Sequence, residues 1–91
     1  MAKWDFLYNN LVYYSYILQL SNKTYYHGFS DDLKNRLKDH ENGAVESTKN
    51  LRPVKLVFYA AFNSKKLALN FEKYLKSSSG SAFRNKRLVE K

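Results

Sequence analysis

Arg36 and His40 lie four residues apart in a segment where Leu33 and Leu37 mark an apolar stripe at helical spacing. At about 100° per residue, Arg36 falls about 60° and His40 about 20° from Leu33, so both are expected on or beside that stripe. Residues four apart on a helix are also neighbours. A surface helix would normally keep its arginine on the far side, as it does Lys34 and Lys38, so these two residues are candidates for a functional site. The same spacing also fits an arginine at the stripe edge and a buried structural histidine.

Two tyrosines are expected to share one face of a β-hairpin. If the turn holds an odd number of residues, with Leu20 opposite Thr24, then Tyr16 faces Gly28 and lies diagonal to Tyr26. A glycine within a strand leaves space beside the backbone, where both hydroxyls could contact a ligand. A two-residue turn would instead place the tyrosines on opposite faces, and packing alone also accounts for aromatic residues in strands.

Glu72 is the third residue with possible chemistry. It falls about 140° from Leu67, at the margin of the apolar stripe of a second helix, with Lys76 one turn further on. An exposed Glu–Lys pair is one interpretation of this spacing. In the C-terminal half, however, Glu72 is the only acid flanked by apolar residues within a predicted element. It is therefore the best available ligand for a divalent metal.

These residues require a sheet and helices to position them. β-branched and aromatic runs predict strands, and capping residues with apolar periodicity predict helices. Ser30 is the expected N-cap of the first helix, and Gly43 follows its last turn. The serine-rich stretch 77–81 is expected to end the second helix. The predicted strands are 13–20, 24–29 and 54–62, the predicted helices are 31–42 and 64–76, and a short basic turn or helix covers 83–90.

The order of these elements is β-β-α-β-α-α, which predicts an α+β fold with a small three-stranded antiparallel sheet flanked by helices. Ninety-one residues suit a single domain spanning 1–91. The segment 1–11 has no functional interpretation, and Trp4, Phe6 and Leu7 are expected to cover a sheet edge or pack on a helix. The apolar stretch 11–20 is too short and polar to span a bilayer, so we expect a cytoplasmic protein with no membrane partner.

The charge distribution indicates a polyanionic partner. The chain holds 16 Lys and Arg against 8 Asp and Glu, a net charge of +8. Eleven of the basic residues and three of the acidic ones follow Gly43, so the whole excess is C-terminal. A basic face of this kind suits a phosphate backbone, although a lysine-rich surface also serves solubility. The absence of cysteine excludes disulfide frameworks, zinc fingers and cysteine enzymes.

Five blocks in order resemble the GIY-YIG nuclease family. Tyr14-Ser15-Tyr16 stands at the first signature strand and Tyr26-His27-Gly28 at the second. DDLKNRLKDHENG resembles the family's helix with its arginine, histidine and closing glycine. TKNLRPVKLVFY resembles its Thr-Lys, Arg-Pro and strand, and FEKYLKSSSG resembles the stretch carrying its glutamate. The resemblance covers about 13–88, and it is closest to small stand-alone bacterial members related to the N-terminal domain of the excision-repair endonuclease.

The resemblance implies a metal-dependent DNA endonuclease. Glu72 would hold one Mg²⁺ or Mn²⁺, Arg36 would meet the phosphate, Tyr16 or Tyr26 would position the water or act as general base, and His40 would relay the proton. Branched or nicked DNA is the expected substrate, and a protein partner or second copy would supply specificity. The residues expected to contact phosphates are Lys49, Arg52, Lys76, Arg84, Lys86 and Arg87.

Three positions depart from the signature: Tyr14 and Ser15 replace its glycine and isoleucine, and His27 replaces a second isoleucine. Alternation along a strand points Ser15 and His27 away from the face of Tyr16 and Tyr26, whereas Tyr14 shares that face and is expected to crowd the site. Two alternatives follow. One is a nucleic-acid-binding module on the same fold with weak or no catalysis. The other is a small basic RNA-associated protein with base-stacking tyrosines.

Overall fold

The predicted hairpin forms strands β1 (Tyr13–Gln19) and β2 (Tyr25–Ser30). The structure is a computed structural model, and it describes residues 12–90. Tyr16 pairs with Gly28 and Leu18 pairs with Tyr26, which is the register expected for an odd turn. The backbone amide of Leu20 donates to the Thr24 carbonyl at 2.8 Å and closes that turn. The expected face of the two tyrosines is therefore confirmed.

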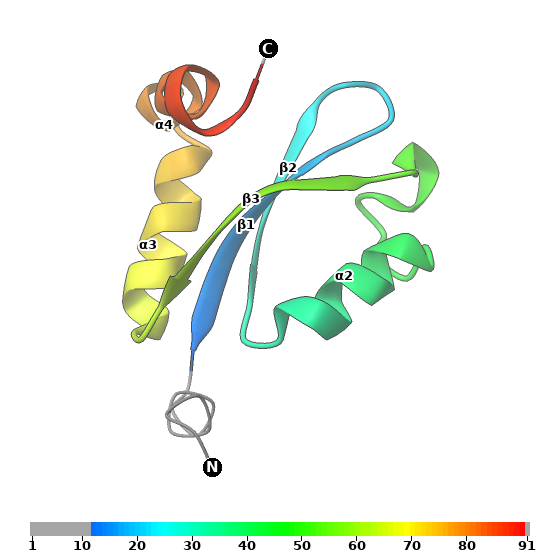
Figure 1. Cartoon of the computed structure of the whole chain (residues 1–91), viewed down its shortest axis with the longest axis horizontal. Coiled ribbons are helices and arrows are strands. Elements are labelled where there is room, and N and C mark those ends of the chain that lie inside the picture. The colour runs from blue at the N-terminus through cyan, green and yellow to red at the C-terminus, as the bar shows by residue number, and fades with distance from the viewer. Residues whose placement is uncertain (1–11, 91) are drawn as a thin grey trace.

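The third strand, β3 (Lys55–Phe62), pairs antiparallel with β1, so the order is β2-β1-β3 and β2 lies at an edge. Helix α2 (Leu33–Glu41) lies on one side of this sheet, and α3 (Lys65–Leu75) with α4 (Ser78–Phe83) lies on the other (Figure 1). The predicted α+β class and three-stranded antiparallel sheet are confirmed. No helix within residues 12–90 is long and apolar enough to cross a membrane.

The face of the sheet towards α2 carries one half of the core. Side chains alternate along a strand, so Tyr16 and Leu18 point to this face, where both are fully buried. The partly buried residues packed against this cluster are Tyr26, Leu33, Leu37, Leu51, Val54 and Leu56. Leu51 belongs to the short 3₁₀ turn η1 (Lys49–Leu51), which leads from α2 to β3.

The opposite face of the sheet packs on α3. Ile17 is fully buried there, and the Ser15 hydroxyl donates to the Ala68 carbonyl, which satisfies a buried polar group. Phe71 of α3 lies 6.2 Å from Phe58, measured between ring centroids, and thereby joins the helix to β3. Two layers of side chains thus hold the sheet: α2 packs on one face, and α3 packs on the other.

The start of α2 differs from its prediction. Asp32, not Ser30, is the N-cap: its carboxylate accepts the Asn35 amide at 3.3 Å, and Leu33 is the first helical residue. The Ser30 hydroxyl instead accepts the Asp32 amide at 2.8 Å and so shapes the turn before the helix. An aspartate and a serine are comparable caps, so the sequence did not decide between them. Gly43 follows the helix with a positive φ of 77°, as expected.

The buried stripe of α3 is rotated from the predicted one. Ala68 and Leu75 are fully buried, but Leu67 is 52% and Tyr74 is 40% exposed. The stripe towards the sheet therefore includes position 72, and the Glu72 side chain is only 17% exposed. Apolar periodicity predicts that this helix is amphipathic. Because its apolar residues form two adjacent stripes, the periodicity does not predict which stripe faces the sheet.

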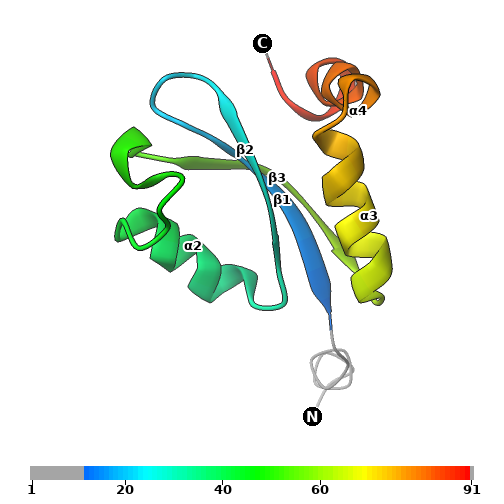
Figure 2. The ribbon, with the colours of Figure 1, turned by 180° about the vertical axis from the view of Figure 1, so that it is seen from behind.

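The second helix ends before the serine-rich stretch, as predicted, but a further helix that was not predicted begins there. Ser77 accepts the Gly80 amide at 3.1 Å and is the N-cap of α4. A π-helical turn, η2 (Arg84–Leu88), follows, and the chain then returns towards the β1–β2 turn (Figure 2). The expectation of a short basic turn or helix near the C-terminus is confirmed by η2. The predictions for Trp4, Phe6 and Leu7 lie outside the described residues.

Candidate active site

Tyr16 reaches the edge of the sheet because β2 carries a glycine opposite it. Its ring lies over Gly28, where a Cβ atom would be 2.7 Å from Cε1 and nearer still to Cζ and the hydroxyl oxygen. Contacts between real Cβ atoms and other heavy atoms are not found below about 3 Å, so only glycine fits here. The tyrosine hydroxyl is thereby aimed at His40 of α2.

A chain of three buried side chains starts at this hydroxyl. The Tyr16 hydroxyl lies 2.8 Å from His40 Nε2, and His40 Nδ1 lies 2.8 Å from the Thr48 hydroxyl. All three residues have an exposed fraction of 0%. Burial lowers the pKa of His40, and the positive charge of Arg36 lowers it further, so the imidazole is neutral at pH 7. A neutral imidazole donates through one nitrogen and accepts through the other, which suits a chain of this kind.

Tyr26 and Arg36 complete the cluster on this face. The Tyr26 ring packs at right angles to His40, with 5.2 Å between ring centroids. Arg36 lies beside both tyrosine hydroxyls, and a hydrogen bond with Tyr16 is the largest of the effects that raise its pKa. Asp39, 4.0 Å away, gives Arg36 a partly exposed ion pair. Tyr26 and Arg36 are both partly exposed, so this is the side open to a ligand.

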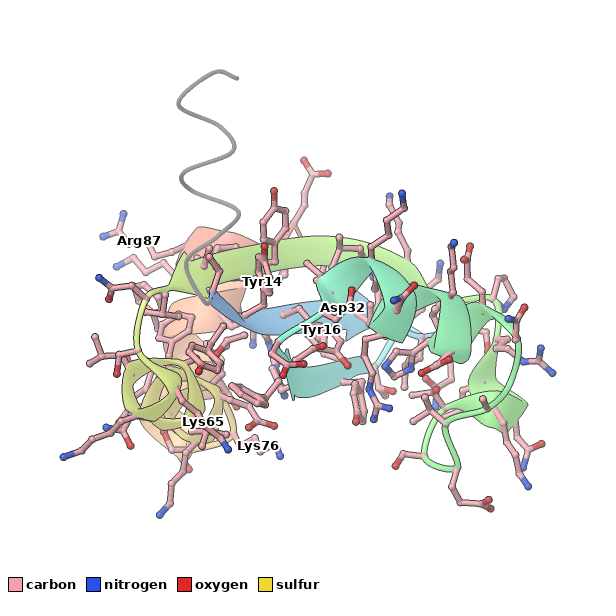
Figure 3. All side chains as sticks on the ribbon, turned by 90° about the horizontal axis from the view of Figure 1, so that it is seen from below. Tyr14, Tyr16, Asp32, Lys65, Lys76 and Arg87 are labelled. Atoms are coloured by element: carbon pink, nitrogen blue, oxygen red, sulfur yellow. The ribbon has the colours of Figure 1, made fainter. Side chains whose placement is uncertain are left out.

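The Tyr16 hydroxyl is a weak acid in this setting. Burial raises its pKa to about 12, while hydrogen bonding to Arg36 opposes the increase. Electrostatic interactions with Tyr26 and, least of all, Glu72 add smaller increases. Glu72 belongs to α3, the helix that packs on the opposite face of the sheet. Figure 3 shows Tyr16 between α2 and α3, with Lys76 extending from α3.

Glu72 has the surroundings of a cation ligand. Its carboxylate is mostly buried and bonds the ammonium group of Lys76 at 3.1 Å, and the Lys76 side chain is 57% exposed. No group of three metal-ligating side chains gathers within residues 12–90. A single carboxylate whose counter-ion is an exposed ammonium group fits Mg²⁺ or Mn²⁺, which retain water ligands and need few protein ligands.

The structure brings Tyr16, Tyr26, Arg36 and His40 together on the α2 side of the sheet, whereas Glu72 lies on α3, which packs on the other side. Thr48 was not singled out from the sequence as a site residue. Its only signal was membership in the Thr-Lys block of the family resemblance, since a buried threonine has no pattern of its own. The spacing of Arg36 and His40 correctly predicted that both lie on or beside the inner face of α2.

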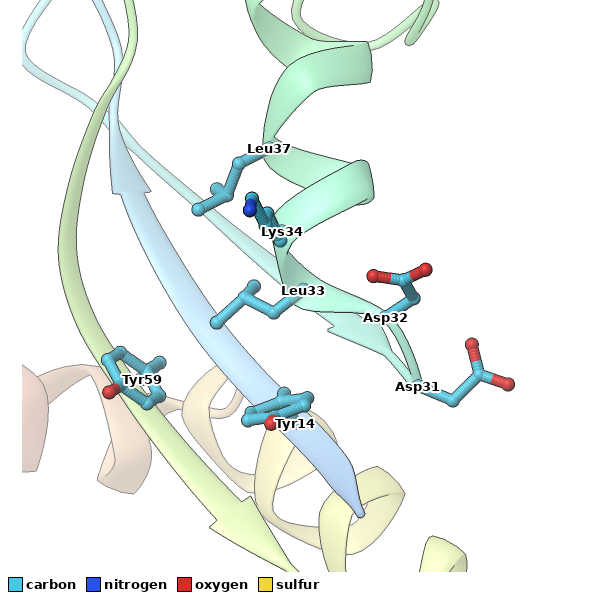
Figure 4. Close-up of a pocket in the computed structure, with 7 residues that line it drawn as sticks. All are labelled: Tyr14, Asp31, Asp32, Leu33, Lys34, Leu37 and Tyr59. Atoms are coloured by element: carbon cyan, nitrogen blue, oxygen red, sulfur yellow. The ribbon is translucent and has the colours of Figure 1, made fainter. Parts of the chain in front are cut away.

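Tyr14 lies beside β3. Its ring packs edge-on against Tyr59, with 6.1 Å between centroids, and no aromatic contact joins it to Tyr26 or His40 within residues 12–90. The two rings line a hollow of about 420 Å³ between the sheet and the first turn of α2 (Figure 4). The other lining residues are Asp31, Asp32, Leu33, Lys34 and Leu37. The bulk of Tyr14 is thus accommodated beside Tyr59, away from the strand that carries Gly28.

The six predicted phosphate contacts form two groups. Lys76, Arg84, Lys86 and Arg87 follow one another from α3 to η2. The other two lie near the end of α2: Lys49 pairs with Glu46 at 3.2 Å, and Arg52 donates to the Lys49 carbonyl at 2.9 Å and to the Glu41 carbonyl at 3.0 Å. The guanidinium of Arg52 is therefore already engaged with backbone carbonyls.

A model of the GIY-YIG catalytic domain matches residues 12–87. The chain therefore belongs to the GIY-YIG family, which makes it a nuclease domain by class. The UPF0213 protein SAG0778 of Streptococcus agalactiae is 39% identical over 70 residues, 76% of this chain and 80% of that protein. The UPF0213 protein YsiG of Lactococcus lactis is 42% identical over 65 residues, 70% of this chain and 62% of that protein.

A solved structure has the same arrangement. The solution NMR structure of the UPF0213 protein BH0048 from Bacillus halodurans aligns with a TM-score of 0.52 and 30% identity, covering 80% of this chain and 81% of that one. The family resemblance found in the sequence is thus confirmed.

Proposed function

We propose that this chain is a metal-dependent DNA endonuclease that hydrolyses phosphodiester bonds with one divalent cation. The proposal is supported most by the cluster on the α2 side of the sheet, in which an arginine interacts with two tyrosines and a neutral histidine lies behind them; a mostly buried glutamate on α3 is the fifth residue. Each supplies one requirement of phosphodiester hydrolysis.

Arg36 meets the scissile phosphate. Its guanidinium is permanently charged, partly exposed and held between the two tyrosines, so it can neutralise charge on the phosphate oxygens without reorganising. Glu72 would hold Mg²⁺ or Mn²⁺ after Lys76 is displaced, and the bound cation would supply Lewis-acid stabilisation and activated water. The phosphates further along the strand contact Lys76, Arg84, Lys86 and Arg87, with Lys49 and Arg52 as a separate group.

The two tyrosines take different roles in this proposal. Tyr26 is partly exposed, so its hydroxyl can contact and orient the attacking water. Tyr16 is fully buried and bonded to His40, so it positions Arg36 and connects the site to the histidine. His40 is neutral, and its Nδ1 contacts Thr48. Its Nε2 can accept a proton through the contact with the Tyr16 hydroxyl.

A weakly active or inactive nucleic-acid-binding module is the second candidate. The observation that favours it is the Tyr16 hydroxyl, which is fully buried and has its pKa raised to about 12. A phenol that is so difficult to ionise is a poor general base at neutral pH. The RNA-associated alternative differs in its ligand, and an RNA that co-purifies at moderate salt and is insensitive to Glu72→Ala would favour it.

Cleavage assays on branched, nicked and single-stranded DNA test the proposal. We expect nicking that requires Mg²⁺ or Mn²⁺, stops with EDTA and falls at least about 100-fold in Glu72→Ala and Arg36→Ala, because each loses charge stabilisation in the transition state. Glu46→Ala is the matched control, since Glu46 also pairs with a lysine on the surface, at the other end of the domain. DNA binding without cleavage above the Glu72→Ala level would establish the binding module instead.

A further inference from the structure

His27 is one of the three departures from the family signature, and the proposed catalytic site does not use it. It lies on the face of β2 opposite Tyr26 and Gly28, and its Nε2 is 3.0 Å from Nη1 of Arg84 in η2. A guanidinium only donates hydrogen bonds, so the imidazole accepts here and is neutral. Burial is the main cause that lowers the pKa of His27 to about 4, and the charges of Arg84 and Lys76 add to it.

Arg84 is held in one orientation by neutral groups. Besides the contact with His27, its Nε donates to the Asn85 side-chain oxygen at 3.1 Å, and its guanidinium carbon lies 4.5 Å from the centroid of the Tyr25 ring. None of these contacts carries a negative charge. No carboxylate lies within ion-pair distance of Arg84 in the described part of the chain. Its charge is thus fixed in place but not neutralised, and N–H donors remain for a ligand.

Arg84 lines a hollow of about 630 Å³ between the β1–β2 turn and η2. Lys23 stands across this hollow, exposed, in a turn where its φ is 69°. Glu90 is the one acid in the lining, and it forms no ion pair with Arg84 or Lys23 within residues 12–90. The complete lining is Gln19, Lys23, Thr24, Tyr25, Arg84, Asn85 and Glu90.

We propose that this hollow, here called the His27–Arg84 site, binds a phosphate group of a nucleic-acid strand. An arginine held by neutral groups, together with a lysine and the side-chain amides of Gln19 and Asn85 in the same lining, has the donors that a phosphate requires. The identity of the ligand rests on the proposed function. It follows from the position of the site, because His27 stands between Tyr26 and Gly28 in the edge strand and a strand passing this edge meets both faces.

DNA binding measured in EDTA tests the proposal without any cleavage. We expect the Kd for a fluorescent branched or single-stranded DNA to rise about tenfold in Arg84→Ala and about threefold in Lys23→Gln. The slope of log Kd against log salt should fall by about one in Arg84→Ala. Lys65→Ala is the control: it removes a lysine from the other end of α3 and should leave both quantities unchanged.

His27→Ile tests the role of the histidine. It supplies the residue of the family signature and releases Arg84 without removing its charge, so a rise in Kd of about threefold is expected with an unchanged unfolding midpoint at pH 7. Arg84→Ala and Lys23→Gln variants that are folded by circular dichroism and bind DNA like the parent would overturn the proposal. A nucleic-acid strand would be rejected as the ligand by two results together: inorganic phosphate shifts the Arg84 NMR signals, and Arg84→Ala leaves the DNA affinity unchanged.

These readouts separate the two proposals. Loss of affinity in Arg84→Ala supports the His27–Arg84 site even if no substrate is ever cleaved. Cleavage that depends on Glu72, with DNA affinity unaffected by Arg84→Ala, supports the endonuclease and rejects the site.

Discussion

Tyr16 and Gly28 are partners across the β1–β2 pair, and the tyrosine ring occupies the space that a side chain at position 28 would need. The glycine therefore sets the direction in which the hydroxyl points. A residue that carries no functional group of its own thus determines the geometry of the cluster formed by Tyr16, His40 and Arg36.

Gly28→Ala should displace the Tyr16 ring. The added Cβ would lie 2.7 Å from Cε1, so we expect a loss of about 1–3 kcal/mol in the free energy of unfolding and at least about a tenfold loss of cleavage. Urea denaturation and single-turnover cleavage measure the two effects. In a Tyr16→Ala background the Cβ has room, so the further loss on adding Gly28→Ala should be much smaller; equal losses in both backgrounds would contradict this account.

Thr48→Val keeps the shape of the side chain but removes the hydroxyl that contacts His40 Nδ1. One nitrogen of a fully buried histidine then lacks a partner, and we expect a loss of about 1–3 kcal/mol in unfolding free energy. Thr48→Ser restores the hydroxyl and should recover most of the loss. The ¹⁵N shifts of the His40 ring should change in the valine variant and not in the serine variant. Identical spectra for both would mean that the 2.8 Å contact does not set the tautomer.

Stability should fall as the pH decreases from 7 towards 4. The pKa of His27 is lowered to about 4, and that of His40 is also lowered, so between pH 6.5 and 4 the unfolded chain binds protons that the folded chain does not. Each histidine contributes a slope of at most about 1.4 kcal/mol per pH unit. Urea unfolding at pH 7.5, 6.5, 5.5 and 4.5 measures it. His27→Gln should make the slope shallower, and a flat profile down to pH 5 would be inconsistent with a fully buried and a partly buried imidazole that are both neutral.

Arg52→Ala should lower the stability of the fold and have only a small effect on DNA affinity. The guanidinium donates to the carbonyls of Lys49 and Glu41, so its removal unties the end of α2 from η1 at a cost of about 1 kcal/mol. Thermal unfolding and DNA binding are both measured, with Lys49→Ala as the comparison that removes a nearby charge from an exposed pair. A larger effect of Arg52→Ala on Kd than that of Arg84→Ala would make Arg52 a principal DNA contact.

The hairpin register and the class of fold were predictable because they depend on local rules. Alternation along the strands and the odd turn between Leu20 and Thr24 fixed which residues share a face with Tyr16. The spacing of Arg36 and His40 likewise placed both at the inner edge of α2. Glu72 was placed at the margin of a stripe, and the rotation of α3 that buries it depends on packing against the sheet.

The contacts that could not be predicted join residues distant in sequence. Arg84 and His27 are 57 positions apart, and no spacing rule connects them. Thr48 reaches His40 through the loop that follows α2, a segment without periodicity. The helical state of residues 78–83 was missed because serine and glycine are weak helix formers, and the capping of α4 by Ser77 overrides that preference.

The edge strand β2 also links the two faces mechanically. Tyr26, His27 and Gly28 are consecutive, so no movement of one leaves the other two in place. A displacement of the strand large enough to release Arg84 from His27 would also shift the glycine over which the Tyr16 ring lies. The contact with Arg84 on one face and the packing of Tyr16 on the other therefore depend on the same peptide segment.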